Sequence, residues 1–280
     1  MATQHFPGWL RVILLILTIA SFYPQLRLLW TRKDGSGISL SYLLLNLICA
    51  TEQFLLAFIY YTMPDGESSM FVETPKSWGD WVNLVQLGVG WVGMGAVFGL
   101  CLLYPSDSRL RHKIGVVVVY IAFLCISLIP AILLVSVGSK SDHHSSEDDF
   151  MFALFTGGHF VFLSPVITLL GLLSVVFQAS RLWKGSPLRA LSLPGLKAQA
   201  ILFAVLAVTW PFRVTYLGNA VWDCFGSWFS GVNWFMFVGW PAVDSAVYAI
   251  IQAVLLGLAR KCNSELDAVG EREPLLRNRE

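Results

Sequence analysis

The sequence predicts an all-α membrane protein that crosses the bilayer seven times. Three observations support this class: the chain is 56% hydrophobic and only 13% charged, it holds seven long apolar segments, and its basic residues gather in alternate loops. A soluble domain carries about 25% charged residues, so the shortage of charge indicates a lipid environment. The net charge of +1 gives no reason to expect a nucleic-acid partner.

Each apolar segment is long enough to span a bilayer, which takes about 20 mostly apolar residues. We expect helices throughout, because lipid cannot satisfy a free backbone amide or carbonyl group. The seven predicted spans are Trp9–Trp30, Leu40–Tyr61, Trp81–Tyr104, Ile114–Val137, Phe160–Leu182, Leu193–Phe212 and Phe235–Leu258.

Charge in the loops predicts the orientation of the chain. The first, third and fifth connections are basic, whereas the second and fourth are mainly acidic. Basic loops face the cytoplasm. We therefore expect a multi-pass protein with a lumenal N-terminus and a cytosolic C-terminus, in agreement with an odd number of spans.

The sequence matches itself when it is shifted by 153 residues. The pattern predicts two parallel triple-helix repeats joined by a linker helix (3+1+3), an architecture that transporters use. The matched residues include Gln25 with Gln178, Trp30 with Trp183, and Ser39-Leu40 with Ser192-Leu193. The predicted parts are the first repeat at 8–104, the linker helix with an acidic lumenal loop at 105–150, the second repeat at 151–260 and a cytosolic tail at 261–280.

A motif near the end of the first span is more specific. Tyr23-Pro24-Gln25 is followed by Trp30, a basic loop and Gly37-Ile38-Ser39-Leu40. This run resembles the PQ-loop family of seven-helix membrane transporters, which includes the lysosomal cystine and cationic amino acid exporters and is similar in fold to the SWEET sugar transporters. The second copy, Phe177-Gln178-Ala179, lacks the proline.

The resemblance implies that Pro24, Gln25 and Gln178 take part in hinge motion or gating. Proline removes one helical hydrogen bond and crowds the preceding turn, so Pro24 is either a hinge or a static kink. We expect Gln25 to bond the carbonyl groups that the proline frees or a neighbouring helix, where its role would be to hold helices together.

Asp244 is the acid placed most centrally in a predicted span. An ionised carboxylate is costly there, so we expect it to face a cavity or a polar partner and to couple transport to protons. Trp240, Asp244, Tyr248 and Gln252 recur every four residues and share one side of the helix, which predicts a polar pathway. The alternative role of Asp244 is a structural carboxyl group bonded to another helix.

Span two adds Glu52 as a second candidate for proton coupling. Asn46 and Gln53 are seven residues apart and share a face of the helix, so both are candidates for the substrate pathway or for bonds between helices. Glu52 points about 100° away from Gln53, so the three side chains cannot all line one narrow site. In span three, the spacing of Gly95 and Gly99 predicts close helix packing.

The tail holds Glu271, Leu275 and Leu276 in a pattern that resembles the acidic dileucine signal read by cytosolic sorting adaptors. Such a signal sends proteins to lysosomes or vacuoles. The Trp222–Trp234 segment has no role that the sequence explains.

These features together predict a transporter of the vacuolar or lysosomal membrane that exports an amino acid, cationic or cystine-like, by proton-coupled alternating access. A SWEET-like sugar uniporter and a non-transporting sorting receptor of the same fold remain alternatives. We expect no enzymatic activity, no cofactor and no metal site, because the sequence lacks a nucleophile–base pairing, a metal-ligand set and a phosphate loop. The expected partners are the lipid bilayer, a small solute, protons and sorting adaptors.

Overall fold

The protein is described by a computed structural model that covers residues 6–62, 71–73, 75–138, 150, 154–183, 190–214, 231–232 and 234–277. These residues form seven helices that are long and apolar enough to cross a membrane, which confirms the predicted fold class and the number of spans. The elements are α1 (Gly8–Arg32), α2 (Leu40–Thr62), α3 (Trp78–Leu103), α4 (Leu110–Gly138), η1 (Gly158–Leu163), α6 (Ser164–Trp183), α7 (Leu193–Thr209), η2 (Trp210–Phe212), η4 (Phe235–Gly239) and α10 (Trp240–Arg277).

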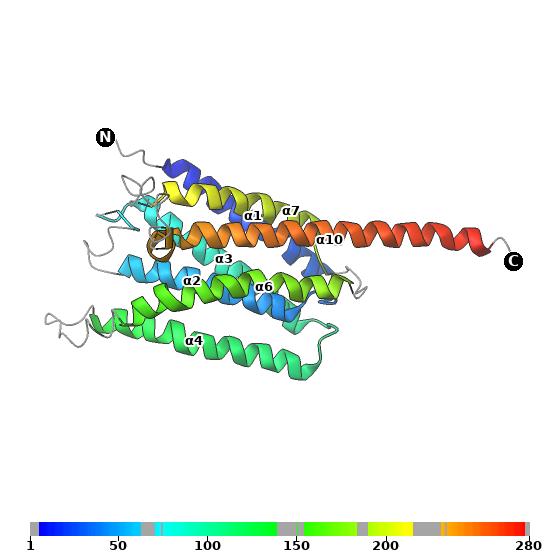
Figure 1. The fold of residues 1–280 in the computed structure, drawn as a ribbon, viewed down its shortest axis with the longest axis horizontal. Coiled ribbons are helices and arrows are strands. Elements are labelled where there is room, and N and C mark those ends of the chain that lie inside the picture. Colours follow the sequence, from blue (N-terminus) through cyan, green and yellow to red (C-terminus); the bar gives the residue numbers. More distant parts are fainter. Residues whose placement is uncertain are drawn as a thin grey trace.

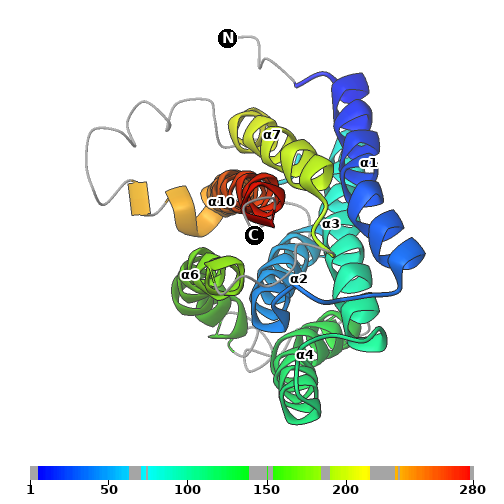
Figure 2. The same cartoon turned by 90° about the vertical axis from the view of Figure 1, so that its right-hand side faces the viewer.

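The helices lie side by side in one bundle, and the start of α1 and the end of α10 are at opposite ends of it (Figure 1). An end-on view places α2 and α3 near the centre and α4 at the periphery (Figure 2). The most apolar stretch of α2 has 67% of its residues buried, against 17% for α4. The exposed apolar side chains of α4 are therefore those expected of a helix that faces lipid.

Helix contacts follow a regular pattern. α3 packs against α1 and α2, and α10 packs against α6 and α7. The main contacts that join these groups are α1 with α7 and α2 with α6, whereas α4 packs against α2. A shift of 153 residues carries α1, α2 and α3 onto α6, α7 and α10, so each contact in one group has a counterpart in the other. Two copies of one three-helix unit would give this pattern.

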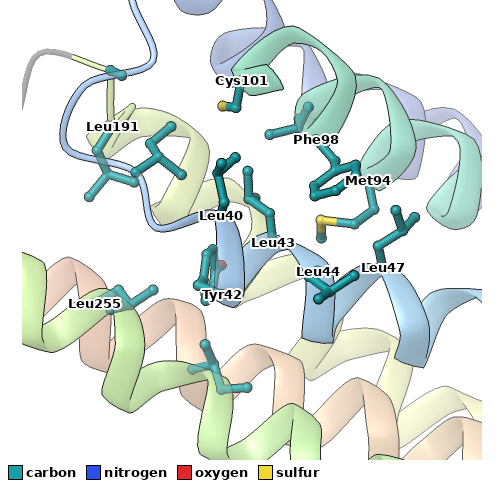
Figure 3. Packing of buried hydrophobic residues seen from close by; sticks show 14 of the residues in the cluster. Leu40, Tyr42, Leu43, Leu44, Leu47, Met94, Phe98, Cys101, Leu191 and Leu255 are labelled. Carbon is teal, nitrogen blue, oxygen red and sulfur yellow. The ribbon is translucent and has the colours of Figure 1, made fainter. Parts of the chain in front are cut away.

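Apolar packing of α2 fixes the centre of the bundle. Leu40, Leu43 and Leu47 lie on the side of α2 that faces Met94 and Phe98 of α3 (Figure 3). All five side chains are buried and belong to one cluster that also takes in residues of α1, α6, α7 and α10. The packing therefore brings both groups of helices onto α2.

Two π-helical segments stand at the start of α6 and α10. η1 runs directly into Ser164-Pro165, and η4 runs directly into Trp240-Pro241. Proline has no backbone N–H and cannot complete the α-helical ladder with the residue four positions earlier. The wider turn is one known response to such a break, and π turns often lie at functional sites. η1 and η4 also contact each other.

The predicted close packing at Gly95 and Gly99 is wrong. A Cβ atom on Gly99 would meet nothing within 4 Å, and one on Gly95 would come only within 3.8 Å of Leu47. The close approach is at Gly93, where a Cβ atom would lie 2.8 Å from the Phe22 ring of α1. Spacing predicts that two glycines share a helix face, but only the packing decides which face meets a neighbour.

The last helix is longer than the predicted seventh span. α10 continues without interruption to Arg277 and extends well beyond the rest of the bundle (Figure 1). The tail, to which the sequence analysis assigned no secondary structure, is therefore helical over most of its length.

An ion pair ties α1 to α3 at the end of the bundle where α1 begins. Arg11 Nη1 and Asp80 Oδ1 are 3.5 Å apart, and both side chains are buried. Asp80 also accepts hydrogen bonds from the backbone N–H and the hydroxyl group of Ser77, which caps α3. Asp80 contributes to the acidic second connection by sequence, but its carboxylate serves to anchor the start of α3.

Candidate functional site

A cavity of about 60 Å³ lies between the helices. Its walls come from α1, α2, α3, α6, α7, η2 and α10, so both groups of helices contribute to it. A space of this size holds a few water molecules. The polar side chains of the wall are Thr18, Asn46, Gln53, Gln86, Thr168, Asp244 and Ser245, and its aromatic side chains are Phe22, Trp91, Phe203, Trp210 and Tyr248.

Asp244 is the charged residue of the cavity wall. Thr168 donates a hydrogen bond from Oγ1 to Asp244 Oδ1 over 2.6 Å, and the side chain of Gln53 bonds the same carboxylate. Gln53 and Thr168 lie near the middle of their own spans. Asp244 is therefore held by α2 and α6 at a depth where lipid surrounds the bundle.

Four of the predicted pathway and coupling residues meet at this cavity. Asn46, Gln53, Asp244 and Tyr248 all line it. Asn46 also donates to Ser174 Oγ over 2.9 Å, and Tyr248 donates to Gln199 Oε1 over 3.1 Å. These bonds hold both side chains in place, so they serve the packing of the helices as well as the cavity.

Two other residues of the predicted stripe lie elsewhere. Trp240 is fully buried and stacks on Phe71, with ring centroids 5.4 Å apart. Gln252 donates to the hydroxyl group of Tyr42 over 2.8 Å and lines a separate cavity of about 30 Å³. Neither side chain is among those that line the larger cavity. The stripe therefore continues along α10 past the ends of the cavity.

Glu52 also stays outside the cavity wall, as the 100° rotation from Gln53 led us to expect. Its Oε1 atom lies 2.8 Å from Nδ1 of His159, a residue of η1. The ring of His159 in turn contacts the ring of Phe155, with 4.3 Å between ring centroids. Glu52 and His159 thus form a second ionisable site next to the cavity.

At the end of the bundle where α1 begins, the cavity wall bonds to a buried arginine. Arg213 donates from Nη1 to Gln86 Oε1 over 2.6 Å, and Gln86 donates to Thr18 Oγ1 over 2.9 Å. Burial, together with the positive charge of Arg11, lowers the pKa of Arg213 to about 9. Arg213 is therefore still mostly protonated at neutral pH, and it places a positive charge directly behind the wall.

At the opposite end, Gln25 joins α1 to the start of α7. Its Nε2 atom donates to the carbonyl oxygen of Ala190 over 2.7 Å, and its Oε1 atom accepts from the N–H of Ser192 over 2.9 Å. Ser192 is the N-cap of α7. Gln25 therefore bonds the neighbouring helix entrance, one of its two predicted roles.

Gln178 of α6 makes the same pair of bonds to the segment that precedes α2. Its Nε2 atom donates to the carbonyl oxygen of Gly37 over 2.8 Å, and its Oε1 atom accepts from the N–H of Ser39 over 2.8 Å. Gly37 and Ser39 correspond to Ala190 and Ser192 under the 153-residue shift, as Gln25 corresponds to Gln178. We call these two sets of bonds the glutamine clamps.

Pro24 lies inside α1, directly before the first clamp. The helix continues past it to Arg32. Pro24 also lines a surface groove together with Leu191 and Pro194, which belong to the segment held by Gln25 and to the start of α7. The proline and the clamp therefore act on the same contact between α1 and α7.

The remaining predicted residues lie at the end of the chain. Glu271, Leu275 and Leu276 belong to the part of α10 that extends beyond the bundle. Positions 222–230 and 233 of the tryptophan-rich segment lie outside the described residues.

His159 and Arg213 are the main site residues that sequence reasoning missed. His159 stands one position before the predicted fifth span, and Arg213 stands one position after the predicted sixth, so both were assigned to loops. The structure starts the fifth span at Leu154 and buries both side chains. A polar residue at the edge of an apolar run is a signal that could have identified them.

Comparison with known proteins gives one match, in the first two spans. Residues 8–64 match the family model of the PQ loop repeat. The matched residues include Pro24 and Gln25, so the resemblance predicted from the first motif is confirmed and the chain carries a PQ-loop repeat in its first two spans. Phe177-Gln178 lies outside these residues. No curated protein and no solved structure is similar enough to count as a match.

The glutamine clamps predict matched losses of stability. Gln25→Ala and Gln178→Ala each leave one buried carbonyl group and one buried N–H group without a partner, which costs about 1–3 kcal/mol for an unsatisfied group. Thermal unfolding in detergent should show a lower midpoint for both variants. Ser180→Ala serves as the control, because Ser180 is half-buried and its hydroxyl group bonds the carbonyl oxygen of Phe177 within α6. A midpoint that does not change in either glutamine variant would contradict the reciprocal clamps.

Proposed function

We propose that this protein is a PQ-loop-type solute transporter that exports an amino acid from a vacuole or lysosome by proton-coupled alternating access. The observation that carries the proposal is the cavity with Asp244 in its wall, placed between two groups of helices with matching contacts. Transporters with parallel repeats bind their substrates at the repeat interface near the midplane.

The proposal includes the 3+1+3 division, with repeats at 8–104 and 151–260, α4 within a linker at 105–150 and the tail at 261–280. The paired helix contacts and the two glutamine clamps support it, because both obey the 153-residue shift. Alternating access then consists of rocking one three-helix unit against the other around the cavity.

The charges around the cavity support an amino acid as substrate. Asp244 supplies a negative group in the wall, and Arg213 supplies a positive group behind Gln86. A zwitterionic amino acid would place its ammonium group toward Asp244 and its carboxylate toward Arg213. A cationic amino acid or cystine carries a further ammonium group, which agrees with the predicted substrate class.

A sugar uniporter is the second candidate, and the composition of the wall favours it to a lesser degree. Asn46, Gln53 and Gln86 supply amide groups, and Trp91 supplies an aromatic face. Sugars bind through such groups without any need for a carboxylate. The role of Asp244 in transport therefore separates the two candidates.

The clamps and Pro24 would form the gate at the end of the bundle where α1 meets α7. Opening that end requires the bonds of Gln25 and Gln178 to break, and Pro24 gives α1 a place to bend because it lacks a helical hydrogen bond. In a vesicle flux assay, Pro24→Ala should lower the flux while the folded yield stays normal. Full flux would leave Pro24 as a static kink.

Loop charge and the tail support the proposed location. The N-terminus would be lumenal and the C-terminus cytosolic, since the basic connections are the first, third and fifth. The helical extension of α10 would carry Glu271, Leu275 and Leu276 away from the membrane, where cytosolic sorting adaptors can reach them.

A substitution that fills the cavity tests the proposed substrate route. A Cβ atom on Gly90 meets nothing within 4 Å and lies in the cavity wall, so the side chain in Gly90→Leu would occupy the cavity. Proteoliposomes are assayed with radiolabelled arginine, cystine, leucine and glucose. We expect one of the amino acids to be transported and Gly90→Leu to abolish its transport.

The matched control for the cavity is Gly99→Leu. Gly99 is on the same helix and also has open space around it, but it does not line the cavity. This variant should transport normally. Equal transport by both variants would place the substrate route elsewhere, and transport of glucose alone would favour the sugar uniporter.

Proton coupling by Asp244 predicts a selective defect in Asp244→Asn. Asparagine keeps the size of the side chain and can still accept the hydrogen bond from Thr168, but it cannot take up or release a proton. The variant should fold and keep substrate counterflow, because counterflow moves no net proton. Uptake driven by a pH gradient should be lost.

Ser245→Ala serves as the control for Asp244→Asn, since Ser245 is the next residue in the cavity wall and does not titrate. It should keep pH-driven uptake. Normal pH-driven uptake by Asp244→Asn would remove the coupling role and favour the sugar uniporter.

The tail predicts both orientation and location. A fluorescent tag on the C-terminus should be removed by protease added to intact organelles, because the tail faces the cytosol. Changing Leu275 and Leu276 together to alanine should move the tagged protein from the acidic organelle to the cell surface. A protected tag would invalidate the orientation, and an unchanged location would show that the dileucine pattern is coincidental.

A further inference from the structure

A buried ionisable pair beside the cavity has no part in the mechanism so far. His159 Nδ1 and Glu52 Oε1 lie 2.8 Å apart, and the two side chains are only 7% and 3% exposed. The pair links η1 to α2. The second carboxylate oxygen, Oε2 of Glu52, has no hydrogen-bond partner among the described residues.

Stability does not explain this pair. Taking two ionisable groups out of water costs more than their attraction returns unless the remaining hydrogen-bonding positions are also satisfied. Oε2 of Glu52 is not satisfied here, and apolar side chains of similar size would pack α2 against η1 without that cost. Ionisable residues inside membrane spans are usually functional, and imidazole is the side chain that ordinarily changes charge near neutral pH.

The surroundings of the pair connect it to Asp244. Glu52 directly precedes Gln53, whose side chain bonds the Asp244 carboxylate, and Cys49, one turn before Glu52 on α2, lines the same cavity as Asp244. Among the described residues, Cys49 and Asp244 lie within electrostatic reach of Glu52, Tyr120 bonds Thr51, the residue before Glu52, and Tyr60 packs on Phe160, the residue after His159. Of these, Asp244 is the acid that also lines the cavity.

The position of His159 is suited to proton uptake. It lies in η1, a π-helical turn of the kind that often occurs at functional sites. Residues 139–149, which connect α4 to this region, belong to the acidic connection that loop charge assigns to the lumen. The pair therefore stands between the proposed lumenal side and Asp244.

We propose that His159 and Glu52 form a proton relay that delivers protons from the lumenal side to Asp244. The relay rests on the proposed proton-coupled transport and names the groups that supply its proton. When the pair gives up its proton, an N–H or O–H bond of the pair breaks and an O–H bond forms on the Asp244 carboxyl group. Neither side chain of the pair lines the cavity, so the final link passes Cys49, which lines it one turn before Glu52, and the few water molecules that the cavity can hold.

The charges balance at each step of this relay. With one proton on the pair, the pair is neutral overall and ionised Asp244 leaves a net charge of −1. Transfer of that proton leaves Glu52 ionised, with His159 and Asp244 neutral, and the net charge is still −1. A second proton from the lumen brings the net charge to zero. No step separates more charge in the apolar interior, where charge separation is most costly.

Two variants test the relay in proteoliposomes supplied with radiolabelled arginine or cystine and containing a pH-sensitive dye. His159→Gln and Glu52→Gln keep side chains that form hydrogen bonds but cannot carry the proton. Both should lose pH-driven uptake and proton flux, down to the level of Asp244→Asn, and both should keep counterflow. Because the pair acts as one unit, the double variant should be no more impaired than either single variant.

Phe155→Leu is the matched control, since the Phe155 ring contacts His159 but does not titrate. It should keep pH-driven uptake. Normal pH-driven uptake by the His159→Gln variant would overturn the proposed relay. Absence of counterflow in the unmodified protein would instead reject the proposed transport function, so the two failures are distinguishable.

A second measurement needs no replacement of the pair. His5, His112, His143 and His144 are changed to glutamine, so that His159 is the single histidine. Its nitrogen-15 NMR signals are then followed from acidic to alkaline pH, with and without Asp244→Asn. A relay requires the two sites to share protons, so the titration midpoint of His159 should shift when Asp244 cannot ionise. An unchanged midpoint would overturn the proposal.

Discussion

The inability of lipid to satisfy polar groups is the constraint on which the rest of this structure depends. Several buried polar side chains bond a partner on another helix, and those bonds help to define which helices are neighbours. Asn46 bonds Ser174, Gln252 bonds Tyr42, and Gln86 bonds Thr18. Each bond joins elements that are far apart in the sequence. Apolar packing around α2 brings the helices together, and the polar bonds restrict them to one arrangement.

The glutamine clamps show how the same constraint produces symmetry. A break between two helices leaves backbone groups unpaired, and a side-chain amide can bond one carbonyl and one N–H at once. Gln25 does so for the segment before α7, and Gln178 does so for the segment before α2. Each group of helices bonds a segment of the other group. Movement at either clamp would therefore disturb the packing of both groups. This reciprocity fits a gate that opens as one unit.

Charged groups in the bundle differ in how fully they are bonded, and that difference guides their interpretation. The Asp80 carboxylate meets Arg11 and the cap of α3, as a structural anchor does. Glu52 retains an oxygen without a partner among the described residues, and Asp244 faces a cavity. A buried carboxylate with an unpartnered oxygen, as in Glu52, is poorly explained by stability. Ionisable groups inside membrane spans commonly mark the pathways along which protons move.

The sequence by itself determined the all-α class, the seven spans and the first PQ-loop motif, because hydropathy, span length and a local motif are properties of contiguous residues. It also placed Asp244, Asn46, Gln53 and Tyr248 on the faces that meet at the cavity, since helical periodicity fixes which residues share a side. Only the tertiary structure decided that Trp240 packs on Phe71, that Gly93 makes the close contact expected of Gly99, and that His159 joins Glu52. These outcomes depend on which helix faces which, and such contacts between distant segments leave no periodic signal in one sequence.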